Sequence, residues 1–213
     1  MVPNRAWTNH AILEVRPARP AQPYQIPLQI AVFPTTSGWC TLYETQAAAD
    51  RPAARLWIER ANDDSPRFFE SVQGPTGQWP AHRTLLEPSR RMLGFVGSDF
   101  APADLGMEFV FWPEQRWIRS EMRRGQFCDV VESALIEPPP AGYARVRAWF
   151  DRGTGGLVCA EAYDASGRLV KEFLPRRFRK TNGRWEVTEL EMLGYPVRSR
   201  SRLILEALPI TRP

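Results

Sequence analysis

The side chains that could do chemistry in this sequence are few, and they form no complete catalytic set. Ser98 and Asp99 could supply a nucleophile and a carboxylate, but no histidine is close in sequence to act as the base. Both residue types also cap helices and occupy turns, which explains them without catalysis. Glu186, Glu189 and Glu191 offer carboxylates on one strand-like segment, where we expect a solvated face. We therefore predict no catalytic residue.

The residues that usually bind metals or phosphates are also sparse. His10 and His82 are the two histidines, and neither is spaced from a cysteine or carboxylate as a metal ligand would be. No glycine-rich phosphate loop follows a strand, so we predict neither a metal nor a cofactor. Cys40, Cys128 and Cys159 each lie in an apolar run and are expected to pack as small hydrophobic residues. A Cys128–Cys159 bridge remains an alternative in an oxidising compartment.

The segment Arg90–Leu105 divides the chain into two parts of different character. A short apolar strand is predicted over Arg91–Val96, ended by the turn-forming residues 97–99. Pro102 suits the first turn of a helix, and Asp104 would lie near the positive end of that helix. We therefore predict a short helix from Pro102 to Gly106.

Strand-like segments lie on both sides of this region. On the N-terminal side they are His10–Arg16, Pro27–Phe33, Trp39–Thr45, Leu56–Glu59 and Arg67–Glu70, with a helical turn expected within Gln46–Ala54. On the C-terminal side they are Trp117–Met122, Phe127–Ser133, Tyr143–Phe150, Leu157–Tyr163, Arg168–Arg179, Arg184–Leu193 and Ser201–Leu208. Tight turns such as Asn182–Gly183 join successive strands, which indicates an antiparallel sheet.

The strand residues also indicate how this sheet is shaped and what one of its faces can hold. Within 184–193, Trp185 and Val187 share one phase of the alternation while Leu190 and Met192 take the other, which predicts a β-bulge. Small residues on one face leave room for a cavity or a closely packed helix; they are Ala144, Ala148, Ala160 and Ala162. The predicted fold is a single α+β domain over residues 1–213, in which a large curved antiparallel sheet forms a half-open barrel covered by short helices.

The order and spacing of several motifs resemble the outer-membrane lipoprotein-sorting (LolA-like) family. The first motif comprises Gly97, Ser98, Asp99, Phe100, Asp104 and Leu105, and later segments continue the resemblance: Trp112–Gln115, Gly125–Glu132, Tyr143–Asp151, Glu161–Asp164, Trp185 and Glu189–Met192. The resemblance extends over roughly 84–208. It implies a non-catalytic periplasmic carrier that holds the acyl chains of lipids or lipoproteins in a hydrophobic cavity during outer-membrane lipoprotein sorting. The long N-terminal helix usual in that family has no evident counterpart before His10.

Aromatic residues are the candidates for such a cavity. The chain has eight tryptophans, eleven phenylalanines and five tyrosines, most of which must pack in the core. The predicted cavity and lid residues are Trp57, Phe95, Leu105, Met107, Phe109, Phe111, Trp112, Trp149, Phe173 and Trp185, with Pro102–Trp112 as the lid. Two groups of arginines are expected to lie on the solvated surface: Arg176, Arg177 and Arg179, and Arg198, Arg200 and Arg202. If the cavity opens beside either group, its guanidinium groups would suit an anionic lipid head group.

Charge and hydropathy limit the possible partners. The net charge is +4 with both signs interleaved, which argues against a nucleic-acid surface, and no apolar run is long enough to cross a bilayer. The sequence begins without an apolar signal segment, and the resemblance favours its removal. Two alternatives stay open. One is a small biosynthetic enzyme on the same fold, as in violacein formation, which a buried Glu or His with a shifted pKa beside the cavity would indicate. The other is a module that recruits an inner- or outer-membrane protein.

Overall fold

The structure is a computed structural model that describes residues 5–61, 65–137, 142–181 and 183–206. Within these residues the chain forms thirteen strands: β1 (Trp7–Arg16), β2 (Tyr24–Thr35), β3 (Gly38–Thr45), β4 (Ala54–Ala61), β5 (Arg67–Val72), β6 (Thr84–Leu85), β7 (Glu114–Arg123), β8 (Gln126–Ala134), β9 (Arg145–Asp151), β10 (Leu157–Tyr163), β11 (Leu169–Thr181), β12 (Arg184–Gly194) and β13 (Ser199–Leu205). The four short helical segments of the same residues are α1 (Pro88–Arg91), η1 (Phe95–Gly97), α2 (Pro102–Leu105) and η2 (Glu108–Phe111).

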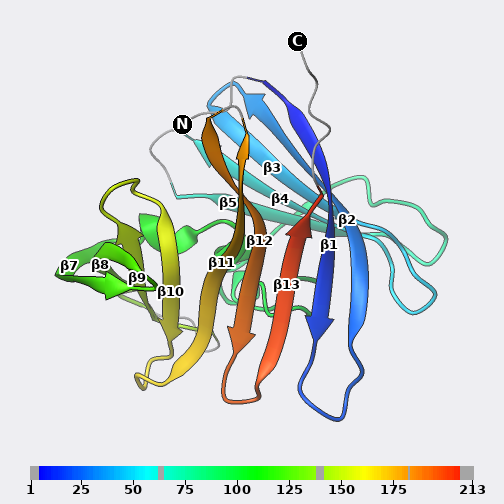
Figure 1. The fold of residues 1–213 in the computed structure, drawn as a ribbon. Helices are drawn as coiled ribbons and strands as arrows, with labels where there is room; N and C mark the ends of the chain where they lie inside the picture. The colour runs from blue at the N-terminus through cyan, green and yellow to red at the C-terminus, as the bar shows by residue number, and fades with distance from the viewer. Residues whose placement is uncertain (1–4, 62–64, 138–141, 182, 207–213) are drawn as a thin grey trace.

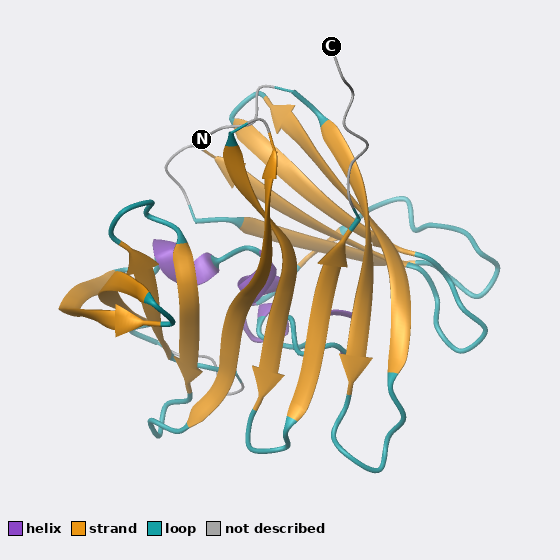
Figure 2. Ribbon diagram, in the orientation of Figure 1, coloured by secondary structure: helices purple, strands orange, loops and turns teal. Residues whose placement is uncertain are grey.

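All the strands belong to one curved antiparallel sheet. Its order is β6-β5-β4-β3-β2-β1-β13-β12-β11-β10-β9-β8-β7, so the first and second halves of the chain meet where β1 pairs with β13 (Figure 1). The short helices lie within the curve of the sheet (Figure 2). This architecture confirms the predicted fold class of a curved antiparallel sheet with few short helices.

The concave face is built by strict alternation along the central strands. In β1, Ala11, Leu13 and Val15 are buried, and their neighbours in sequence are more exposed. A period of two places such residues on one face of a strand. They form a core cluster with Phe100, which comes from between η1 and α2, and with Met192 of β12. The segment 86–113, which we call the lid segment, therefore packs directly on the concave face.

The structure corrects two local predictions. Residues 91–96 do not form a strand; α1 ends and η1 begins there instead. Pro88 starts α1, and Val96 and Gly97 have φ values of 47° and 80°, which a strand cannot contain. The expected helical turn in 46–54 is instead a tight turn, because Ala48 and Arg51 exchange backbone hydrogen bonds. The helix at Pro102 is confirmed as α2.

The predicted bulge and hairpin are confirmed at the end of β11 and β12. The register between these strands shifts between Pro175 and Arg177 and again between Arg177 and Phe178. Thr181 pairs with Arg184, which leaves a two-residue connection. Residue 182 of that turn, the proline run 138–140, the turn residues 62–64 and the end of the last predicted strand lie outside the described residues.

A second core cluster lies on the face opposite to Ala148. Val130, Trp149 and Cys159 are cross-strand neighbours there, and Cys128 joins them. The end of β7 lies over this cluster, because Arg123 Nη2 donates to Glu161 Oε1 of β10 at 2.6 Å. Cys40, Cys128 and Cys159 are buried free thiols, as the packing interpretation predicts.

Candidate functional site

A small cavity separates the lid segment from the concave face of β9–β12. Asp104, Met107 and Phe109 line it from the lid segment; the sheet contributes Val146, Ala160, Ala162, Lys171, Phe173 and Met192. Its volume is about 20 Å³, which is room for about one water molecule. The lining is apolar except for Asp104 and Lys171. The cavity therefore has no room for a larger ligand while Asp104, Met107 and Phe109 of the lid segment lie against the sheet.

Small side chains allow the lid segment to approach the sheet. Ala148, Ala160 and Ala162 of β9 and β10 share a buried cluster with Ala103 and Phe109 of the lid segment. Ala103 is fully buried, so this part of the lid segment has no gap beneath it. The sequence predicts that this alanine face leaves room for a cavity or a closely packed helix. In the structure it does both: it packs against Ala103 of α2, and Ala160 and Ala162 also line the small cavity.

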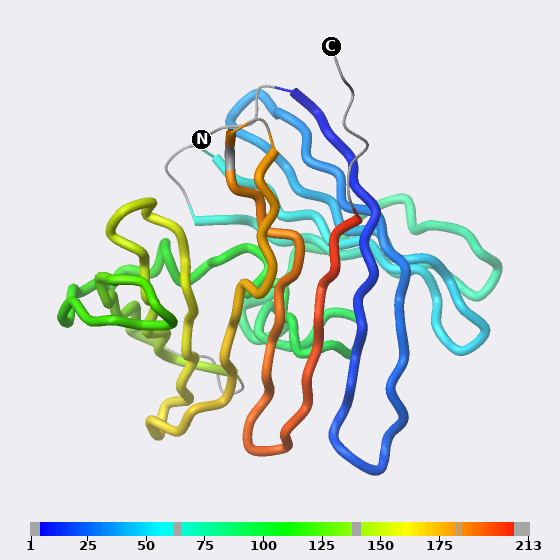
Figure 3. Tube along the Cα trace, in the orientation of Figure 1, coloured from blue at the N-terminus to red at the C-terminus, as the bar shows by residue number. Residues whose placement is uncertain are grey.

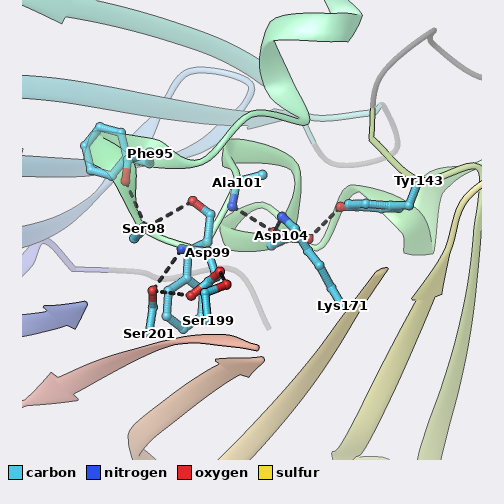
Figure 4. A network of polar contacts seen from close by, with 10 residues as sticks. Phe95, Ser98, Asp99, Ala101, Asp104, Tyr143, Lys171, Ser199 and Ser201 are labelled. Atoms are coloured by element: carbon cyan, nitrogen blue, oxygen red, sulfur yellow. Dashed lines mark hydrogen bonds and ion pairs between the residues drawn. The ribbon is translucent and has the colours of Figure 1, made fainter. Parts of the chain in front are cut away.

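The first polar anchor of the lid segment is Asp99 (Figure 4). Its carboxylate accepts hydrogen bonds from the hydroxyls of Ser199 and Ser201 of β13, and its backbone N–H donates to Ser201 Oγ at 2.8 Å. Gly194 makes this approach possible, since a Cβ there would lie 2.7 Å from Asp99 Oδ1. Ser98 Oγ donates to Phe95 O at 2.8 Å and closes the turn. Ser98 and Asp99 thus have structural partners.

The second polar anchor is Asp104, which lies at the cavity (Figure 4). Asp104 Oδ2 accepts from Ala101 N at 2.7 Å and from Lys171 Nζ at 2.8 Å, and Oδ1 accepts from Tyr143 OH at 2.6 Å. The Asp104 and Lys171 side chains are 9% and 16% exposed, so this is a largely buried ion pair. Burial, together with the charge of Asp104, raises the pKa of Tyr143 well above its ordinary value. The bonds from Tyr143 and Lys171 tie α2 to the segment just before β9 and to β11.

A further buried carboxylate lies on the lid segment at Glu108. It forms an ion pair with Arg91 at 2.5 Å, and burial raises its pKa while Arg91 opposes the shift. Glu108 Oε2 and Trp112 Nε1 are buried without hydrogen-bond partners among the described residues. Glu108 is the kind of residue that the enzymatic alternative requires. However, it faces Arg91 and is absent from the cavity lining.

The predicted site residues are distributed over several environments. Met107, Phe109 and Phe173 line the cavity, and Trp112 packs beside it against Tyr143. Three other predicted residues pack outside the cavity. Phe95 is buried against β4 and β5, and Leu105 packs on two core clusters. Phe111 lies under the guanidinium of Arg60, which also donates a hydrogen bond to Gly106 O.

Three predicted cavity tryptophans do not lie at the cavity. Trp149 has the opposite phase to Ala148 and donates through Nε1 to Glu121 Oε1 at 2.7 Å on the other face. Trp57 likewise has the opposite phase to the buried Leu56. Trp185 is 67% exposed at the end of the β11–β12 hairpin. The sequence interpretation selected them as aromatic residues in strands, without resolving which face each occupies.

Sequence reasoning missed the polar partners of the lid segment, which are Tyr143, Lys171, Ser199 and Ser201. Lys171 had a usable signal, because it is one of two lysines in an arginine-rich chain and lies within a strand. The solvated face expected for Glu189 and Glu191 is wrong. Both are buried, and both are paired on β12 with arginines of β11 and β13.

Within the described residues, no group of three or more His, Cys, Asp or Glu side chains could hold a metal ion. Nor does any described helix have the length and apolar character needed to span a membrane.

Solved structures of low sequence identity share this architecture. An outer membrane lipoprotein-sorting protein domain from Vibrio parahaemolyticus superposes with a TM-score of 0.78 at 15% identity, covering 96% of this chain and 85% of that one. A DUF1329 family protein from Desulfovibrio piger gives 0.75 at 16% identity, covering 98% and 88%. A LolA superfamily protein from Nitrosomonas europaea gives 0.67 at 17% identity, covering 97% and 89%. The protein therefore has the LolA-like fold, which confirms the resemblance at the level of fold.

A family model described as "Uncharacterized protein" matches residues 82–211. The chain belongs to this family. No curated protein matches the sequence. The family assignment covers the lid segment and the strands from β7 onward, which are the elements that build the cavity.

Proposed function

We propose that this protein is a non-catalytic periplasmic binder or carrier of lipid or lipoprotein acyl chains, acting in outer-membrane lipoprotein sorting, with a protein of the inner or outer membrane as a further partner. The observation that supports this proposal is the cavity under the lid segment, whose lining is apolar apart from the Asp104–Lys171 pair. An acyl chain is the ligand class that matches an apolar lining with few polar groups.

Binding requires movement of the lid segment, because a cavity of about 20 Å³ is too small to admit an acyl chain. Met107 and Phe109 occupy the lid side of this space. If they move away, an acyl chain can take their place against the sheet residues that line the cavity. Each buried methylene contributes about 0.8 kcal/mol, so ten methylenes give about 8 kcal/mol before the cost of opening. That gain corresponds to a dissociation constant near 1 μM.

The enzymatic alternative is less well supported. Its best candidate is Glu108, which is buried but faces Arg91 outside the cavity lining. The cavity itself presents a carboxylate and an ammonium that already satisfy each other at 2.8 Å.

The test compares two neighbouring positions of η2. Phe109 is 6% exposed and lines the cavity, while Val110 is 38% exposed and does not. Phe109→Asp places a charge where the acyl chain would lie, so we expect binding of palmitate and of a triacylated lipopeptide to weaken by about tenfold or more. Val110→Asp adds the same charge outside the cavity and should leave binding unchanged. Native mass spectrometry of the delipidated protein with each ligand measures both.

Folding of the variants is checked by thermal melting. Met107→Asp supplies a second cavity variant at a half-buried position, which is less demanding for folding. The proposal fails if the wild-type protein binds neither ligand, or if Val110→Asp weakens binding as much as the cavity variants do.

A further inference from the structure

A second, open hollow lies at the turn ends of two neighbouring hairpins. β1 pairs with β13, so the β1–β2 and β12–β13 turns project side by side at one end of the sheet (Figure 3). The hollow between them measures about 850 Å³. Four arginines line it: Arg16 and Arg19 from the first hairpin, and Arg198 and Arg200 from the second. We call this site the arginine hollow.

The positive charge of the arginine hollow is largely uncompensated by acidic side chains. Its lining includes no aspartate or glutamate among the described residues. Of the four arginines, Arg200 alone has an ion-pair partner in that part of the chain, Glu191, at the long distance of 3.7 Å. By contrast, Arg202, the next outward arginine on β13, pairs with both Glu14 and Glu189.

Cross-strand pairing concentrates this positive charge further. Arg16 and Arg200 are directly opposite each other in the β1–β13 register. Like charges in that position destabilise a sheet. Arg19 and Arg198 then add two more guanidinium groups from the turns, and both side chains are exposed. An anion bound between the four groups would relieve this repulsion.

We propose that the arginine hollow binds a phosphate group carried by a ligand, as on an anionic phospholipid head group or a soluble phosphate ester. Guanidinium groups bind phosphate oxygens through paired N–H donors, and several arginines can share one phosphate. The exposed Val197 and the half-buried Tyr195 at the same hollow provide apolar surface beside the phosphate. This proposal is independent of acyl-chain binding, because none of its residues lines the cavity under the lid segment.

The arginine hollow is also connected to the lid segment. Ser199 lines the hollow, and its hydroxyl donates to the Asp99 carboxylate, the first anchor of the lid segment. The phosphate site therefore lies next to a residue that holds the lid segment on the sheet.

The test removes two arginines that have no ion-pair partner among the described residues. Arg16→Gln/Arg198→Gln lowers the charge of the hollow by two. The matched control, Arg5→Gln/Arg124→Gln, removes two exposed arginines elsewhere and gives the same net charge. Two probes are compared: co-sedimentation with vesicles of phosphatidylcholine containing phosphatidylglycerol, and calorimetric titration with glycerol 3-phosphate. Vesicles of phosphatidylcholine alone provide the uncharged reference.

We expect the hollow variant to weaken binding by about tenfold or more, and the control variant to change it by less than about threefold. Binding to the charged vesicles without measurable binding of glycerol 3-phosphate identifies a lipid head group as the source of the phosphate. Binding of glycerol 3-phosphate identifies a soluble ester. Absence of binding to both probes, or an equal loss in the hollow and control variants, overturns the proposal whether or not acyl chains bind.

Discussion

The anchor formed by Asp104 and Lys171 provides the sharpest test of how the lid segment is held. We consider Asp104→Asn, Lys171→Met and the double variant. Asp104→Asn keeps the shape of the side chain but leaves the Lys171 ammonium without its counter-charge in a largely buried position. Lys171→Met removes the ammonium, while Asp104 retains its bonds from Ala101 N and Tyr143 OH.

The magnitudes follow from burial. Removing one partner of a buried ion pair costs about 3–5 kcal/mol. The Lys171 side chain keeps 16% exposure, so we expect the lower end, about 3 kcal/mol, for Asp104→Asn. Lys171→Met should cost less, about 1–3 kcal/mol, because the Asp104 carboxylate keeps its hydrogen bonds from Ala101 N and Tyr143 OH. The double variant leaves no unpaired charge, so the coupling free energy should be about 1–3 kcal/mol.

Urea unfolding at pH 7 of the wild-type protein and the three variants measures this coupling free energy. A chain of this length should lose about 2–4 °C in Tm for each kcal/mol, which gives a second measure. The exposed pair Arg179–Glu186, whose side chains are 31% and 47% exposed, is the control. A double-mutant cycle on this control pair should give a coupling free energy of about 0–1 kcal/mol. Equal coupling in the two cycles would refute the reasoning, because burial would then have no effect.

Three further predictions concern other buried or tightly packed positions. Burial raises the pKa of Tyr43 to about 12, and that of Tyr143 also rises, whereas tyrosine in the unfolded chain titrates near about 10. The stabilising contribution of both tyrosines is therefore complete below about pH 10, and that of Tyr43 is lost as the pH rises through about 12. The contribution of Tyr143 is likewise lost at alkaline pH, so Tyr143→Phe should flatten this loss in unfolding titrations. Gly94→Ala should lower stability by about 1–3 kcal/mol in urea unfolding, because the new Cβ would lie 1.9 Å from Ser98 O; an unchanged midpoint would show that the turn relaxes. Burial raises the pKa of the three cysteine thiols, so a thiol reagent should label them slowly in the native protein and fully in urea; fast native labelling would contradict the packing of Cys40, Cys128 and Cys159.

Much of the sheet can be predicted from the sequence because its signals are local. The buried residues of β1 alternate with more exposed ones, and the tight turns fix the antiparallel order of neighbouring strands. The phase change in β12 likewise predicts the register shift near Arg177. Local signals do not specify how the two halves of the sheet are joined, since the strands that pair there, β1 and β13, lie at opposite ends of the chain.

The lid segment and the site depend on non-local contacts and are harder to predict. Residues 91–96 are apolar enough for a strand, but the left-handed backbone at Val96 turns the chain onto the concave face. The serines that anchor Asp99 are about one hundred residues away, and Lys171 is 67 residues from Asp104. Trp149 is another residue whose environment depends on distant contacts. The end of β7 lies over its face of the sheet, which would otherwise be exposed to solvent.

Under the proposed carrier function the lid segment must move, and the bonds of its two polar anchors are affected differently by that movement. The apolar contacts of Phe109 can be replaced by those of an acyl chain, so their loss costs little in the bound state. Asp104 lines the cavity, and its bonds to Lys171 and Tyr143 must break or be replaced when the chain enters. Asp99 and its serines lie outside the cavity lining and can persist. We therefore expect the lid segment to open at Asp104 and to hinge near Asp99. On this reasoning Asp104→Asn raises the affinity for palmitate by weakening the closed state, whereas Ser201→Ala lowers stability without that gain; a gain in both variants would contradict the hinge.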